Sequence, residues 1–168
     1  MSEAEESTVG HAGIIEKVAG FYHKALDKAS KALKWLGEHG FDEPSLLETF
    51  GLGYASGKLV KALPKQEENT SQALRESGIL TSAGEEYFLH CLTVPLLDPE
   101  NNIVSMAGHD LESGEERVLA NACTALWNAP AARVHPELLL ASGILDGLSL
   151  YRARAGTGPQ GQVFTIDK

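Results

Sequence analysis

Cysteine is scarce in this sequence, which contains only Cys91 and Cys123 and no C-x-x-C spacing. Two such distant thiols indicate neither a zinc module nor a disulfide framework. Apolar runs are also short, and none approaches the roughly 20 residues that a membrane-spanning helix needs. The first 13 residues contain three glutamates but no lysine or arginine, which argues against a signal peptide. We therefore expect a protein of the reducing cytoplasm with no membrane partner.

Common metal-binding and catalytic motifs are missing too. The six histidines form no H-x-H or H-x-x-x-H pair, so they predict no metal site. The glycine-rich segment GLGYASG, residues 51–57, lacks the Lys-Ser/Thr ending of a phosphate-binding loop, and we interpret it as a turn. His90 and Cys91 are neighbours on a predicted strand and face opposite ways, so they cannot share a proton directly.

Positive charge is in deficit overall but not everywhere. The 168 residues carry a net charge of −9, with 43% hydrophobic and 22% charged residues, as in a single soluble globular domain. The deficit disfavours a dedicated nucleic-acid-binding protein, because lysine and arginine make most phosphate contacts. Between Lys17 and Lys65, however, there are eight lysines and five acids, whereas residues 66–132 hold eleven acids and two arginines. The chain is basic in its first part and acidic in its middle.

A lysine-rich amphipathic helix is predicted over residues 14–36, where apolar residues recur every three or four positions. At about 100° per residue, four lysines fall within an arc of about 60° beside the apolar stripe. These lysines are Lys17, Lys24, Lys28 and Lys31. They form either an ordinary solvated face or a track for a nucleic-acid backbone.

Shorter elements follow along the chain. A helix over 44–50 is indicated by Asp42 as its cap and by Pro44 in its first turn. We expect a helical turn over 58–63, a small helix ended by Gly78, and a hairpin of strands 87–97 and 103–107 joined by the turn DPENN. A loop and a short strand ending near Trp127 come next. The apolar run 138–140 then predicts a buried strand that leads into a helix with Asp146 in its first turn.

Four short motifs occur in a fixed order along these elements. They are Trp35-Leu36 followed by Gly40, Phe50 followed by Gly53-Tyr54-Ala55, Gly78-Ile79-Leu80, and a hairpin carrying Phe88, Pro95, Asp98 and Gly108. This succession resembles the catalytic core of bacterial-type DNA primases, and is most similar to primase-like proteins of plasmids, transposons and phages. The resemblance runs from about Phe21 to Ala155 and continues into the first strand and helix of a Toprim domain.

The departures from the family pattern fall on charged positions. The Toprim glutamate, which in that family acts as a general acid or base or helps to organise metal ions, aligns with Ser142. The first Toprim aspartate aligns with Asp146, and two arginines expected to touch the nucleic-acid backbone align with Cys91 and His109. The sequence contains no D-x-D pair and no zinc-binding cysteine cluster.

These substitutions bear on the chemistry that the resemblance implies, which is DNA-directed synthesis of RNA primers with Mg²⁺. Nucleotidyl transfer needs divalent cations held by carboxylates, and a serine hydroxyl is a poor substitute. We therefore expect no intact catalytic residue, with Ser142 and Asp146 as degenerate positions, and we predict no cofactor. The frame around them is expected to remain because its leucines pack in the core.

The predicted fold class is α+β, becoming α/β at the C-terminal end, with a helical N-terminal portion, a small antiparallel sheet and a truncated Toprim-like βα unit. The predicted domain boundaries are a disordered tail over 1–13, a primase-core-like domain over 14–132, a Toprim-like beginning over 133–155 and a second tail over 156–168.

The predicted function is a primase-like protein, catalytically inactive alone, that binds single-stranded DNA weakly along Lys17, Lys24, Lys28 and Lys31. Its other partner would be a replication or mobile-element protein. One alternative is a scaffold without a nucleic-acid role, whose acidic surface between Glu67 and Glu116 meets a basic partner. Another is the front piece of a longer, active primase.

Overall fold

The computed structural model describes residues 3–62, 68–98, 100–120 and 141–154. Its helices are α1 Glu3–Leu26, α2 Ser30–His39, α3 Pro44–Thr49, α4 Leu59–Ala62, α5 Glu68–Glu76 and α7 Ile144–Arg154. Its strands are β1 Gly53–Tyr54, β2 Cys91–Leu97, β3 Ile103–Asp110 and β4 Glu116–Val118. No helix within these ranges is long and apolar enough to cross a membrane.

The described strands form one antiparallel sheet in the order β1-β2-β3-β4. The hairpin of β2 and β3 confirms the prediction from DPENN: the Asp98 carboxylate accepts a hydrogen bond from Asn102 N at 2.8 Å, and Asn101 has a φ of 72°. Asparagine tolerates this left-handed conformation better than most residues. The mixture of helices with a small antiparallel sheet confirms the predicted α+β class.

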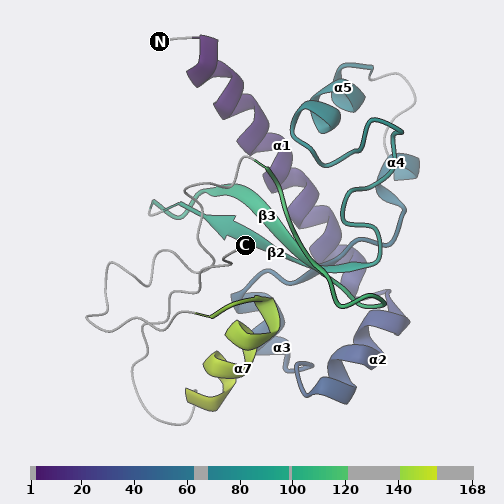
Figure 1. Cartoon of the computed structure of the whole chain (residues 1–168), viewed down its shortest axis with the longest axis vertical. Helices are drawn as coiled ribbons and strands as arrows, with labels where there is room; N and C mark the ends of the chain where they lie inside the picture. Colours follow the sequence, from purple (N-terminus) through teal and green to yellow (C-terminus); the bar gives the residue numbers. More distant parts are fainter. Residues whose placement is uncertain (1–2, 63–67, 99, 121–140, 155–168) are drawn as a thin grey trace.

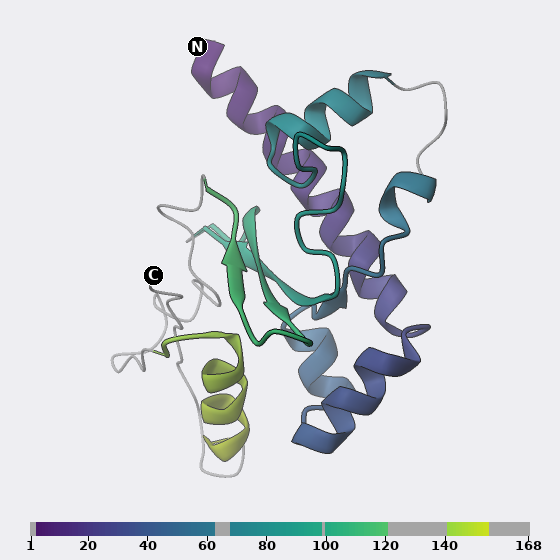
Figure 2. The ribbon, with the colours of Figure 1, turned by 45° about the vertical axis from the view of Figure 1, so that its right-hand side comes forward.

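The two faces of the sheet carry separate hydrophobic cores. α1 crosses one face diagonally (Figure 1) and packs Ile15, Val18 and Tyr22 there in a core with Met106. α2, α3 and α7 pack on the opposite face, and Figure 2 shows α7 on the other side of the strands from α1. The register explains the division, because residues paired directly across a ladder point to the same face.

A row of small residues lets α1 approach its face closely. Gly53 pairs with Thr93, and Thr93 pairs with Gly108, so the three lie side by side on the α1 face. A Cβ at Gly53 would lie 2.8 Å from His23 N and 2.8 Å from the Tyr22 carbonyl carbon. The backbone of α1 therefore rests directly on the backbone of β1.

The single helix predicted over 14–36 is wrong. The chain leaves the helix after Leu26 and starts α2 at Ser30, with Ala29 N donating to Leu26 O at 2.9 Å in the intervening turn. The physical reason is packing on two faces: Val18 and Tyr22 belong to the α1 core, whereas Leu36 belongs to the core on the opposite face of the sheet.

The N-terminal end of α1 also differs from the prediction. α1 begins at Glu3 and so includes most of the segment 1–13 that was predicted to be a disordered tail. Helix-favouring alanine and glutamates near its start are consistent with this extension.

Three further differences concern strands. β1 was expected as part of a turn, and β2 begins at Cys91 rather than at residue 87 because the chain turns just before it, with His90 at a φ of 65°. Between residues 111 and 120 the structure has β4, which pairs with β3. The predicted strand ending near Trp127 and the predicted strand 138–140 lie outside the described residues.

Candidate nucleic-acid interface

A groove of about 530 Å³ lies where the end of α1, the start of α2 and the loop after β1 meet. Lysines from these segments line it together with two aromatic residues. They are Lys24, Lys28, Lys31 and Lys58, with Phe21 and Tyr54. All four lysines are exposed, and Lys31 forms an ion pair with Glu112. We call this feature the lysine groove.

The helix break builds the lysine groove. Because the chain turns after Leu26, Lys24 lines the groove from the last turn of α1, Lys28 from the turn itself and Lys31 from the first turn of α2. The N-cap of α2, Ala29, makes no side-chain capping hydrogen bond within the described residues. The unpaired N–H groups and partial positive charge of a helix N-terminus add to the attraction for anions.

Lys58 reaches the lysine groove from a segment remote in sequence. It follows β1 and directly precedes α4, whose first residue donates its Leu59 N–H to the buried Glu86 carboxylate at 2.8 Å. Tyr54, on β1, completes this side, and burial raises the pKa of its hydroxyl. That hydroxyl stays protonated and can donate to a phosphate oxygen.

The structure thus brings together three of the four lysines that the sequence singled out. Lys17 does not line the lysine groove, but it lies on α1 seven residues before Lys24 and is exposed. Seven residues are close to two helical turns, about 10 Å along the axis, so Lys17 lies on the same face of the helix. Lys58 was missed, because nothing in the local pattern of its segment links it to α1.

The two positions that the sequence predicted to be degenerate Toprim residues lie elsewhere, at the start of α7. Ser142 and Asp146 are both exposed, and the Ser142 hydroxyl donates a hydrogen bond to the Asp146 carboxylate. Glu116 of β4 also reaches this helix end, where its Oε1 accepts a hydrogen bond from Ile144 N at 3.3 Å. The same oxygen lies 3.0 Å from His109 Nδ1. Sequence reasoning missed Glu116, whose pairing with His109 depends on the β3–β4 register.

The side chains at the start of α7 do not fit the Mg²⁺ that the family uses. Magnesium prefers an octahedral set of oxygen ligands that includes carboxylates. The Asp146 carboxylate accepts a hydrogen bond from the Ser142 hydroxyl. Glu116 Oε1 accepts a hydrogen bond from Ile144 N and lies within hydrogen-bond distance of His109 Nδ1. Within the described part of the chain, no group of three His, Cys, Asp or Glu side chains is placed to hold a metal ion.

Cys91, which the resemblance aligns with a family arginine, is buried at the start of β2. Burial raises the pKa of its thiol to about 12. A thiol that stays protonated at neutral pH is neither a charged contact for phosphate nor an effective nucleophile.

The comparison with protein-family models identifies one family. A family model described as DNA primase catalytic core, N-terminal domain, matches residues 21–128. No curated protein matches the sequence.

Solved primase structures share the fold at low sequence identity. A DnaG primase catalytic domain bound to ssDNA has a TM-score of 0.79 at 16% identity, covering 98% of this chain and 57% of the other. The Aquifex aeolicus primase, with zinc-binding and RNA polymerase domains, has a TM-score of 0.77 at 20% identity, covering 100% and 45%. The RNA polymerase domain of Mycobacterium tuberculosis primase DnaG, in complex with double-stranded DNA carrying a 6-nucleotide overhang, has a TM-score of 0.72 at 19% identity, covering 95% and 55%.

The chain spans about half the length of these structures, and the likeness to them concerns the fold. The family model covers most of the sequence, including α2, the sheet and the residues of the lysine groove. The chain therefore belongs to the family of the DNA primase catalytic core, N-terminal domain.

Proposed function

We propose that this chain is a primase-like protein that binds single-stranded nucleic acid in the lysine groove and does not synthesise primers by itself. The observation that carries the proposal is the convergence of Lys24, Lys28, Lys31 and Lys58 beside Phe21 and Tyr54. A positively charged groove that tracks the backbone, with an aromatic ring on which a base stacks, is a common arrangement for single-stranded ligands. The partly exposed Phe21 offers such a ring, whereas Tyr54 is 6% exposed. Lys17 would extend the contact along α1.

Two of the matched primase structures support a DNA ligand. One is bound to ssDNA, and another is in complex with duplex DNA that has a 6-nucleotide overhang. The net charge of −9 points to modest affinity, since acidic residues outnumber basic ones and repel phosphate. A protein of a replication or mobile-element locus would then supply part of the binding energy.

Removing lysines from the groove is expected to weaken binding. The double variant Lys28→Ala/Lys58→Ala should lose about tenfold in affinity for a 20-nucleotide single strand at low salt, because two ammonium–phosphate contacts are lost. Fluorescence anisotropy with a labelled oligonucleotide measures the affinity. Wild-type affinity should also fall steeply as salt rises.

A matched control removes the same charge outside the groove. Lys34 and Lys61 are both exposed and do not line it, and Lys34 lies 3.7 Å from Glu38. The double variant Lys34→Ala/Lys61→Ala should keep its affinity within about twofold. Equal losses in the two double variants, or no binding by the wild type at low salt, would contradict the proposal. The second of these results is what a scaffold protein would give.

The purified chain is expected to make no RNA primers from a single-stranded template and nucleoside triphosphates, with either Mg²⁺ or Mn²⁺. The support for this is the replacement of the family glutamate by Ser142 and the hydrogen bond between Ser142 and Asp146. Radiolabelled nucleotides and gel electrophoresis would detect products. Primers that appear with the wild type and vanish in Asp146→Asn would show that the site is active.

A second proposal is that the chain supplies the front piece of a longer primase. It is favoured by the coverage of the matched structures, of which this chain spans 57% or less. Reading the coding sequence beyond Lys168 tests it. A D-x-D segment there would support it, and a stop codon directly after Lys168 would exclude it.

A further inference from the structure

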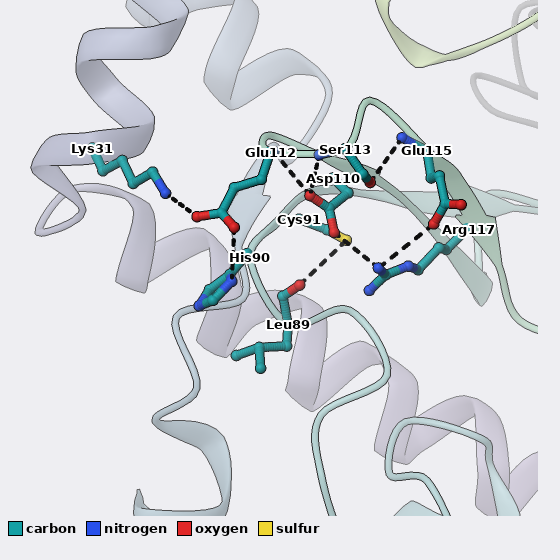
Figure 3. A network of polar contacts seen from close by, with 9 residues as sticks. All are labelled: Lys31, Leu89, His90, Cys91, Asp110, Glu112, Ser113, Glu115 and Arg117. Carbon is teal, nitrogen blue, oxygen red and sulfur yellow. Dashed lines mark hydrogen bonds and ion pairs between the residues drawn. The ribbon is translucent and has the colours of Figure 1, made fainter.

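One carboxylate reaches the lysine groove from the turn between β3 and β4. The Glu112 side chain forms an ion pair with Lys31, and its other oxygen lies 4.0 Å from His90 Nδ1 (Figure 3). The hydrogen bond between Lys31 and Glu112 lowers the pKa of Glu112 and raises the pKa of Lys31, so both side chains are charged at neutral pH. Lys31 therefore already has an anionic partner in the free protein.

The turn holds Glu112 in this position. The Asp110 carboxylate accepts hydrogen bonds from Glu112 N at 2.8 Å and from Ser113 N at 3.1 Å. Arg117 fixes Asp110 from the other side at 2.8 Å, as Figure 3 shows. Gly114 has a φ of 75°, which lets the chain reverse within the turn. These backbone contacts do not depend on the Glu112 side chain.

The pair is placed where an incoming phosphate would compete for it. Lys31 lines the lysine groove together with Lys24, Lys28 and Lys58. The Lys31 and Glu112 side chains are 60% and 56% exposed, so solvent screens their attraction and the pair is weak enough to open. The carboxylate offsets the charge of the Lys31 ammonium, so a ligand phosphate gains the full attraction of this charge only after the carboxylate has moved away.

We infer that Glu112 is a built-in counter-ion of the lysine groove, which a nucleic-acid phosphate must displace from Lys31 in order to bind. This inference rests on the proposed function and adds a residue that limits its affinity. The Glu112 carboxylate lowers the affinity of the lysine groove for phosphate, and it keeps the Lys31 charge neutralised when no ligand is present. It makes the groove selective for ligands with enough phosphates to engage the other lysines first.

The direct test is Glu112→Gln, which keeps the size of the side chain and removes its charge. Affinity for a 20-nucleotide single strand at low salt is expected to rise by about threefold to tenfold. Glu115→Gln is the matched control, because it changes the net charge equally from the same turn. The Glu115 side chain is 71% exposed and lies 3.9 Å from Arg117, and it is expected to change affinity by less than twofold.

A second variant separates displacement from general repulsion. In a Lys31→Ala background, Glu112→Gln should give no larger gain than Glu115→Gln, since there is no ammonium left to release. Circular dichroism should show that every variant keeps the wild-type helix content. An equal gain from the two glutamine variants, or a full gain without Lys31, would overturn the inference.

The test also separates this inference from the proposed function. If the wild type binds DNA and Lys28→Ala/Lys58→Ala weakens it, the lysine groove stands whatever Glu112 does. If the wild type binds through those lysines but Glu112→Gln binds no better, only the role of Glu112 fails. If neither the wild type nor Glu112→Gln binds, both fail together.

Discussion

Replacing Gly53 by alanine is expected to destabilise the folded chain by about 3 kcal/mol, because β1 has no room for a side chain. The new Cβ would lie 2.8 Å from His23 N and 2.8 Å from the Tyr22 carbonyl carbon, both of which are backbone atoms. A helix backbone cannot rotate away as a side chain can. α1 would have to lift from the sheet, which would loosen a core that includes Val18 and Met106.

Urea unfolding followed by circular dichroism would measure this loss. Gly20→Ala is the control, since Gly20 lies on α1, the helix that contacts Gly53, and a Cβ at Gly20 would meet nothing within 4 Å. Alanine is favoured over glycine within a helix by roughly 0.5–1 kcal/mol, so the control should be slightly more stable than the wild type. Wild-type stability in Gly53→Ala would show that α1 moves away from β1 without cost.

Replacing Glu86 by alanine should cost about 2–4 kcal/mol. Glu86 is 6% exposed and accepts hydrogen bonds from the Tyr22 hydroxyl at 3.1 Å and from Leu59 N at 2.8 Å. Removing it would strand two donors in the protein interior, one on α1 and one at the start of α4. Burial, followed by the charge of Glu86, raises the pKa of Tyr22, so the tyrosine remains a donor.

The neighbouring acid supplies the comparison for Glu86. Glu85 is exposed and should lose no more than about 0.5 kcal/mol on replacement by alanine. Because Glu86 holds the first residue of α4, its loss should also disturb Lys58 and weaken DNA binding. Equal unfolding free energies for Glu85→Ala and Glu86→Ala would mean that the two buried donors find other partners.

Local chemistry was enough to predict several elements. Pro44 marks the start of α3, the Asp98–Asn102 turn joins β2 and β3, and Asp146 lies in the first turn of α7. Each depends on residues within a few positions of one another. The helical spacing of Lys24, Lys28 and Lys31 likewise led to one groove, even though the helix assumed for them is interrupted.

Features set by distant packing could not be predicted. The break after Leu26 has no proline or glycine to mark it: the residues there are Asp27, Lys28 and Ala29, and lysine and alanine favour helices. Only the division of apolar residues between two faces of the sheet requires it. Glu112, Glu116 and Lys58 approach their partners through strand register and loop path, which one-dimensional spacing does not encode.

The break after Leu26 also lies between two helices that pack mainly in different cores. Lys24 lies on α1 and Lys31 on α2, and both line the lysine groove. A small change in the angle between α1 and α2 would alter the distance between the Lys24 and Lys31 ammonium groups. A substitution in either core, for instance at Val18 or Leu36, would therefore change the affinity of the lysine groove for anions although every lysine is kept.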